Sequence, residues 1–214
     1  MTARSRLRFG LIAIVAFALG LFLARALLTP AAPALPVTER ATILPQPRLL
    51  PALALVDQDG QPLPAGYLRD RWTLVFFGFT QCPDVCPTTL AMLAQLKKEL
   101  VDLPADQQPH VLLISVDPER DTPAVMKAYV SFFDPAFAAA TGTVAGATQA
   151  ATAFSVPFAK VPLPGGGYTM DHGAGLFVVS PAGAMAGYFS PPLAAPALAR
   201  DFRKLLAYYK STHG

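Results

Sequence analysis

Cysteine and histidine are scarce in this sequence, which has two cysteines and three histidines among its 214 residues. Both cysteines, Cys82 and Cys86, stand in one short segment. Any chemistry that needs a thiol therefore has to use this pair. The chain also lacks an internal repeat, and its length suits one domain of ordinary size with an additional segment.

Basic residues are not in excess outside the N-terminal segment. The formal net charge is +3, but the first 48 residues contain six arginines and a single acid, Glu39. The remaining residues carry 11 basic and 13 acidic side chains. The basic character thus belongs to the N-terminal segment, which excludes a nucleic-acid surface on the rest of the chain.

The N-terminal segment has the pattern of an export or membrane signal. Arginines at positions 4, 6 and 8 precede an uncharged run at residues 9–24, which reaches residue 28 if Arg25 is accepted near its end. About 20 helical residues span the roughly 30 Å of a bilayer core. We favour a membrane anchor at residues 1–28 over a signal peptide cleaved at residues 24–26. Both interpretations place the following domain in the periplasm or an equivalent exported space, and the anchor makes the protein a single-pass protein of the inner membrane.

Residues 29–48 are rich in proline and alanine, as in an extended linker. A folded domain is expected at residues 49–214, where apolar strands alternate with amphipathic helices. This order predicts an α/β fold, with a central sheet flanked by helices on both faces, in the thioredoxin-like arrangement. We expect strands at 52–56, 72–79 and 111–116, helices at 88–101, 123–133 and 146–154, a hairpin of 176–179 with 185–189, and a last helix at 194–209.

The two cysteines follow a buried strand, and each precedes a proline. If Pro87 lies in the first turn of a helix, Cys86 stands at or just before the helix N-terminus, which favours a thiolate. Two thiolates on one loop form a reversible disulfide or half of a soft-metal site. Two unrelated buried cysteines and a structural disulfide are alternatives, but closing so short a loop adds little stability. We favour a reactive pair.

His172 is the histidine that the topology places near this pair. It precedes the strand at 176–179, and the loop before that strand packs beside the cysteine loop in the expected fold. Two thiolates and an imidazole suit Cu(I), and a fourth ligand would suit Cu(II). A structural zinc site would need a fourth protein ligand. His110 precedes a strand, as a solvated boundary residue would, and His213 lies next to the C-terminus, so neither is expected at the site.

Asp117 and Asp121 lie in a polar loop after the strand at 111–116. They are candidates for binding a metal or orienting the site. We favour a simpler interpretation, in which Asp121 caps the helix that Pro123 opens. Met170 is a candidate soft neighbour of the site, although such a methionine more often only packs.

Three segments carry a specific family resemblance: FGFTQCPDVCPTTL at 77–90, SVDPERDTP at 115–123, and Asp171-His172. Together they resemble the Sco/SenC family of copper-binding assembly factors for cytochrome c oxidase, over about residues 52–209. The resemblance implies a thioredoxin-like fold, a single N-terminal membrane helix, and copper ligation by Cys82, Cys86 and His172. Two positions depart from the family pattern. Gln81 stands where many members have histidine, and Gly173 stands where Ser or Thr usually follows the metal-binding histidine.

The sequence therefore predicts a membrane-anchored copper chaperone that delivers copper to the copper-A centre of cytochrome c oxidase. Its expected partners are the copper-A subunit and other copper chaperones or thiol reductants. The main alternative is a thiol–disulfide oxidoreductase that reduces partner cysteines through a redox pair, Cys82 and Cys86. A peroxiredoxin-like peroxidase is a weaker alternative, since its nucleophile would need no histidine ligand.

Overall fold

The computed structural model of the chain describes residues 3–28 and 34–213. The chain divides into two compact units, and the larger comprises Leu35–Lys210. The N-terminal unit contains helix α1, Ala3–Leu28. Among the described residues, no helix combines the length and the apolar character needed to cross a membrane. Residues 29–33 of the expected linker lie outside the described part of the chain.

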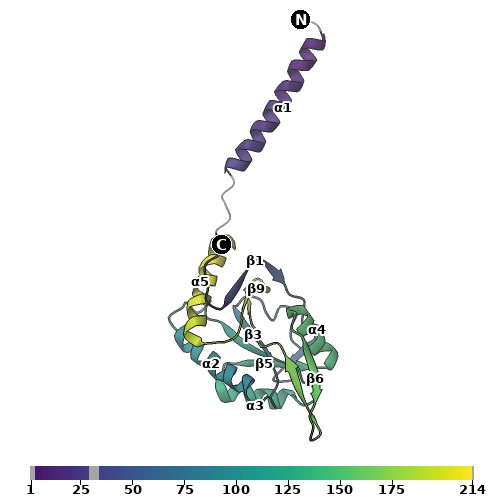
Figure 1. Ribbon diagram of the computed structural model, residues 1–214, viewed down its shortest axis with the longest axis vertical. Coiled ribbons are helices and arrows are strands. Elements are labelled where there is room, and N and C mark those ends of the chain that lie inside the picture. The colour runs from purple at the N-terminus through teal and green to yellow at the C-terminus, as the bar shows by residue number, and fades with distance from the viewer. Residues whose placement is uncertain (1–2, 29–33, 214) are drawn as a thin grey trace. The chain divides into compact units, whose positions relative to one another are not determined.

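A mixed seven-stranded sheet forms the centre of the larger unit (Figure 1), with the strand order β1-β9-β8-β3-β4-β5-β2. The three central strands β3, β4 and β5 are parallel, and the other pairs are antiparallel. All six residues of β3 are buried, as expected for a continuous apolar run covered on both faces. The strands are β1 Ala41–Leu49, β2 Leu55–Asp57, β3 Thr73–Gly78, β4 His110–Ser115, β5 Ala138–Gly142, β8 Leu176–Val179 and β9 Ala184–Phe189.

Helices cover both faces of this sheet, which confirms the predicted α/β class. Helices α2 (Val85–Glu99) and α3 (Pro123–Phe133) lie side by side and connect successive parallel strands, so right-handed crossovers place them on one face. Helix α4 (Val144–Phe154) covers the other face, where Phe154 packs edge-on against Phe77 and Phe177. Helix α5, Ala195–His213, closes the domain.

A separate two-stranded sheet was not foreseen from the sequence. Strands β6 (Phe158–Pro162) and β7 (Tyr168–His172) pair in antiparallel register and form a hairpin that projects from the body of the domain (Figure 1). Four of the five residues of β6 are exposed. His172 is the last residue of this hairpin and lies on a strand, whereas we expected it in a loop.

The folded unit begins earlier than the expected boundary at residue 49. Strand β1, Ala41–Leu49, takes up residues 41–48 of the predicted linker and pairs with β9. Asp201 of α5 holds its start, because the buried carboxylate accepts hydrogen bonds from the backbone N–H groups of Glu39, Arg40 and Ala41 at 2.7–3.0 Å. Burial would raise the pKa of Asp201, but these donors outweigh it and the pKa is lowered. A long-range anchor of this kind has no local sequence signal.

Candidate metal centre

The two cysteines lie where β3 passes into α2. Helix α2 begins at Val85, so Cys86 is its second residue, and both cysteines are free thiols. Cys82 is half-buried, whereas Cys86 has no exposed surface. The backbone N–H of Cys86 donates to the Cys82 sulfur, with 3.4 Å between the atoms. The first N–H groups of a helix have no acceptor within the helix, so this one is free to donate to the Cys82 sulfur.

Gly78 provides the space that Cys86 occupies. A Cβ at position 78 would lie 2.9 Å from Cys86 Sγ, 3.0 Å from Phe76 Cε1 and 3.2 Å from Leu113 Cδ1. Real side chains do not accept such contacts without moving. The glycine that ends β3 therefore fixes how deeply the Cys86 sulfur can sit against the sheet.

The buried position of Cys86 changes the expected protonation state. Desolvation by burial raises the pKa of this thiol, and a backbone hydrogen bond involving Phe79 opposes the shift only partly. The helix N-terminus does not outweigh desolvation, so the expectation of a free thiolate at Cys86 is wrong for the metal-free protein. Cys86 is a thiol that loses its proton when it binds a metal.

The imidazole of His172 faces the Cys86 sulfur. Nε2 lies 3.8 Å from Cys86 Sγ, and Nδ1 lies 3.1 Å from the backbone oxygen of Gly173. A carbonyl oxygen only accepts, so Nδ1 carries the proton and Nε2 keeps a lone pair directed at the thiol. The rings of Phe76 and Phe79 meet the imidazole edge-on, with centroids 6.2 and 6.0 Å away.

Burial also keeps this imidazole neutral. Desolvation lowers the pKa of His172, and the hydrogen bond to Gly173 offsets part of the shift. A neutral ring with a protonated Nδ1 is the form in which histidine binds metals. His110 differs, since it lies exposed at the start of β4 as expected.

The structure thus brings Cys86 and His172 together and leaves Cys82 beside them at the surface. Within the described residues, no cluster of three or more His, Cys, Asp or Glu side chains is close enough to hold a metal ion. The donor types nevertheless suit a soft metal, since thiolate and imidazole are the ligands that copper prefers. Nothing in the described chain supplies the fourth protein ligand of a structural zinc site.

Asp121 has a different role from the predicted helix cap. Thr122 is the N-cap of α3, and its side chain accepts from the backbone N–H of Val125. Asp121 is fully buried and accepts from Thr80 N at 3.2 Å, Thr80 Oγ1 at 2.5 Å and Ser115 Oγ at 2.6 Å. It therefore fixes the backbone two residues before Cys82, which is the orienting role and not the capping role favoured from the sequence.

Asp117 belongs to a polar cluster beside the cysteine loop. It pairs with Arg120 and accepts from the Tyr168 hydroxyl at 2.9 Å. Arg120 also donates to the Gln81 side chain. Sequence reasoning missed Arg120 and Tyr168, because a cluster formed by three separate segments has no signal in any one of them. Met170 is largely buried in the apolar core, in agreement with a packing role.

Tyr129 on α3 is a further residue that sequence reasoning missed. Within the described residues its hydroxyl is buried and has no hydrogen-bond partner. Burial raises its pKa, and the nearby Cys86, Cys82 and Asp121 raise it further. The thiols are thus bordered by a phenol that stays protonated.

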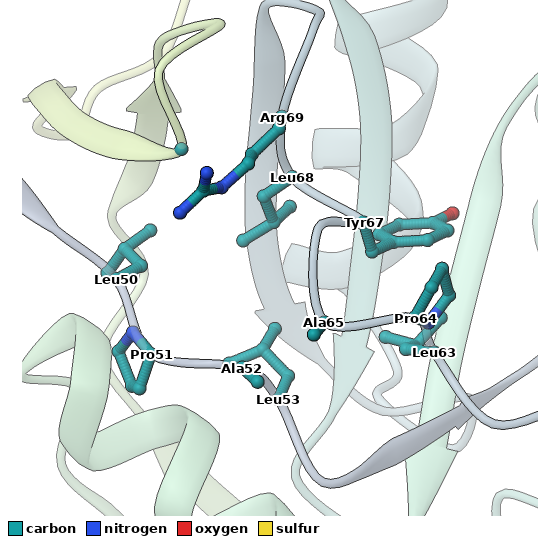
Figure 2. Close-up of a pocket in the computed structure, with 11 residues that line it drawn as sticks. Leu50, Pro51, Ala52, Leu53, Leu63, Pro64, Ala65, Tyr67, Leu68 and Arg69 are labelled. Atoms are coloured by element: carbon teal, nitrogen blue, oxygen red, sulfur yellow. The ribbon is translucent and has the colours of Figure 1, made fainter.

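A surface pocket elsewhere in the domain does not match this chemistry (Figure 2). It lies between the end of β1 and the segment at 63–69, and leucine side chains form much of its wall. Arg69 is the one charged side chain in its lining, and neither cysteines nor histidines contribute to it. The chemistry of the domain is concentrated at the cysteine loop.

Comparison with known proteins gives a consistent result. A family model described as SCO1/SenC matches residues 43–207. A Stutzerimonas stutzeri protein, provisionally named a copper-binding protein, is 37% identical to this chain over 166 residues. The match covers 77% of this chain and 80% of that protein. The mitochondrial SCO2 homologue of Bos taurus is 33% identical over 74% of this chain, but the match spans only 60% of that protein's own length.

A solved structure shares the fold. The structure of Bradyrhizobium japonicum ScoI with copper bound has a TM-score of 0.64 and 35% sequence identity, and the match covers 73% of this chain and 99% of that one. The central sheet and its flanking helices are therefore those of the thioredoxin-like Sco structures.

Proposed function

The chain belongs to the SCO1/SenC family, and from this we propose that it is a copper carrier. It binds copper through Cys82, Cys86 and His172 and delivers it to the copper-A centre of cytochrome c oxidase. The observation that carries the proposal is the position of His172, whose Nε2 lies 3.8 Å from Cys86 Sγ while Nδ1 lies 3.1 Å from the Gly173 carbonyl oxygen, which assigns the proton to Nδ1. An imidazole in this tautomer is prepared to bind a metal and serves no need of a simple dithiol.

The two thiols have different tasks in this proposal. Cys86 and His172 form a buried pair, and Cys82, which is half-buried, turns toward them to complete the site. Binding of Cu(I) by both cysteines releases a proton from each thiol, so uptake is favoured as pH rises. In delivery, a thiolate of the partner displaces Cys82 first, because Cys82 is the more accessible ligand.

We also propose that residues 1–28 anchor the protein in the inner membrane and that the domain works in the periplasm or an equivalent exported space. The support is the charge pattern, with arginines at positions 4, 6 and 8 before an uncharged run at 9–24. An exported location would bring the carrier to a copper-A centre on the same side of the membrane.

A second candidate function is reduction of partner disulfides. Its support is the contrast between a half-exposed Cys82 and a buried Cys86, four residues apart and both free. The Cys82 thiolate would attack a partner disulfide and form a mixed disulfide. The Cys86 thiol would then lose its proton, attack the Cys82 sulfur and displace the partner's second thiolate, which takes up a proton. The partner gains two electrons and the carrier is left as a disulfide. Both functions need the dithiol, so only His172 separates them.

Replacement of His172 distinguishes the two functions. We expect His172→Ala to lower copper affinity by more than the roughly 10–100-fold that a residue outside the ligand set contributes, with Cu(II) affected more than Cu(I). The reduction potential of the Cys82–Cys86 pair should stay unchanged. Equilibrium copper competition and thiol–disulfide titration measure the two quantities. His110→Ala, at the exposed start of β4, is the matched control.

Oxidase assembly in cells provides the functional readout. With His172→Ala, assembly should fail at ordinary copper levels and recover with added copper. If this variant binds copper as tightly as the wild type and supports assembly normally, the carrier function is wrong and disulfide reduction takes its place.

A further inference from the structure

The hairpin that carries His172 is held to the rest of the domain by few polar contacts. Its strands form their own sheet, separate from the seven-stranded one. Apart from the contacts of His172 itself, the side-chain hydrogen bonds that join β6 and β7 to other described residues all lead to residues 117–120. Apolar packing of Met170 and Phe158 also holds the hairpin, but its polar side-chain contacts, and with them the directional restraint on the strand that carries the imidazole, come from this short loop after β4.

Arg120 makes the central contacts in that loop. Its guanidinium lies over the Tyr168 ring, 3.8 Å from the ring centroid, and pairs with the buried carboxylate of Asp117. Nη1 donates to the backbone oxygen of Tyr168 at 3.1 Å. Tyr168 and His172 are four residues apart on β7, so they share one face of the strand.

The same nitrogen of Arg120 reaches the cysteine loop. Nη1 donates to Gln81 Oε1 at 2.9 Å, and Gln81 immediately precedes Cys82. One guanidinium thus joins the strand that carries His172 to the loop that carries the thiols. Nε pairs with Asp117 at the same time, so the planar guanidinium makes from two nitrogens the contacts that the single nitrogen of a lysine ammonium cannot make together.

The arrangement is not explained by stability alone. Nη2 of Arg120 is buried and lacks a hydrogen-bond partner among the described residues. A buried donor without an acceptor costs free energy. A guanidinium kept in this position in spite of that cost is consistent with a geometric task.

We propose that Arg120 is a positioning residue that links the β6–β7 hairpin to Gln81 and thereby sets His172 over Cys86. The proposal rests on the copper-carrier function and adds a residue to it. Gln81 provides the acceptor for this link through its side-chain oxygen. It stands at a position where the family resemblance leads us to expect histidine. Arg120 touches neither sulfur in this role and acts only through the placement of the imidazole.

Arg120→Lys tests the proposal, because it keeps the charge and removes the fork. We expect copper affinity to fall about 10–100-fold, and the Cu(II) absorption and electron paramagnetic resonance spectra to shift because the imidazole is displaced. The reduction potential of the cysteine pair should not change. Lys160→Gln is the matched control, since Lys160 lies over the same ring and pairs with Glu119 but contacts neither Gln81 nor the Tyr168 oxygen. Its copper affinity should stay within about twofold of the wild type.

Substitutions at Gln81 test the link from the other side without disturbing the core, because this residue is exposed. Gln81→Leu removes the acceptor and should shift the Cu(II) spectra in the same direction as Arg120→Lys. Gln81→Glu keeps an acceptor for Arg120, so its Cu(II) spectra should resemble those of the wild type. These two variants decide the question even if Arg120→Lys fails to fold.

The outcomes separate this inference from the function on which it rests. If Arg120→Lys or Gln81→Leu binds copper with the affinity and the spectra of the wild type, the positioning role is wrong. The carrier function is then left intact. A wild-type domain that binds no copper overturns both.

Discussion

The two halves of the site are built in different ways. The cysteine half extends from β3, in which every residue is buried. Its loop is held by the buried carboxylate of Asp121, which accepts a hydrogen bond from Thr80. The histidine half is a hairpin whose first strand is mostly exposed and whose turn contains Gly166 and Gly167 at positive φ. Segments with few buried contacts open at a lower free energy than the core. If the chain is the copper carrier proposed above, we therefore expect the imidazole to leave the metal more readily than the Cys86 thiolate, which suits release of the cargo.

Loss of Asp121 should have the largest effect on this contrast. Asp121→Ala leaves donors of Thr80 and Ser115 without their acceptor in a buried place. We expect it to lower the free energy of unfolding by about 2–4 kcal/mol. The matched change in the histidine half, at the exposed Asp171, should stay within about 0.5 kcal/mol. Denaturant unfolding measures both, and equal losses would contradict the division into two halves.

The same carboxyl group predicts a pH dependence. Burial raises the pKa of Asp121 above its ordinary value, so the folded domain binds this proton more tightly than the unfolded chain does. The stabilisation is complete below the unfolded pKa of about 3.9 and is lost as pH rises through the folded pKa. Asp121→Asn cannot ionise, so we expect the unfolding free energy of this variant to lack that decline. A decline of equal size in the variant would assign it to another group.

Two glycines, one in each half of the site, also test the contrast in packing. Gly78→Ala places a Cβ 2.9 Å from Cys86 Sγ, so we expect a loss of about 1–3 kcal/mol of stability and a displaced sulfur with weaker copper binding. Gly165→Ala, in the hairpin turn, meets no atom within 4 Å and should change stability by less than about 0.5 kcal/mol. Unfolding and copper competition on both variants check this. A tolerated alanine at position 78 would show that the core does not fix the depth of the thiol.

The same contrast explains what could be predicted from the sequence. The central elements were predicted because apolar periodicity and turn residues encode them locally, as for α3 at 123–133 and the hairpin of β8 with β9. The approach of His172 to Cys86 followed from topology together with the family resemblance. The central elements lie in the well-packed part of the domain, and His172 was placed only because its hairpin ends against that part, beside Cys86.

Features that depend on distant partners were missed. Strand β1 is rich in proline and looks like linker, and its pairing with β9 and the Asp201 anchor are separated from it by more than a hundred residues. Strand β6 carries a weak apolar pattern because it is largely exposed, and Met170 is the single buried residue of the short strand β7. The protonation state of Cys86 depends on desolvation in the folded state, which outweighs the helix-terminus effect that the sequence suggests.

The smallest effect is expected where the sequence departs from its family next to the histidine. At Gly173, a Cβ would lie 3.6 Å from both Pro157 Cδ and Val156 Cγ1, which is ordinary contact. The backbone oxygen that accepts from His172 Nδ1 is present whatever the side chain. We therefore expect Gly173→Ser to change stability by less than about 0.5 kcal/mol and to leave copper affinity and the Cu(II) spectra unchanged, as measured by unfolding and copper competition. A tenfold or larger change in affinity would mean that a side chain at this position reaches the imidazole, and that the backbone of the hairpin does not by itself define the orientation of the ring.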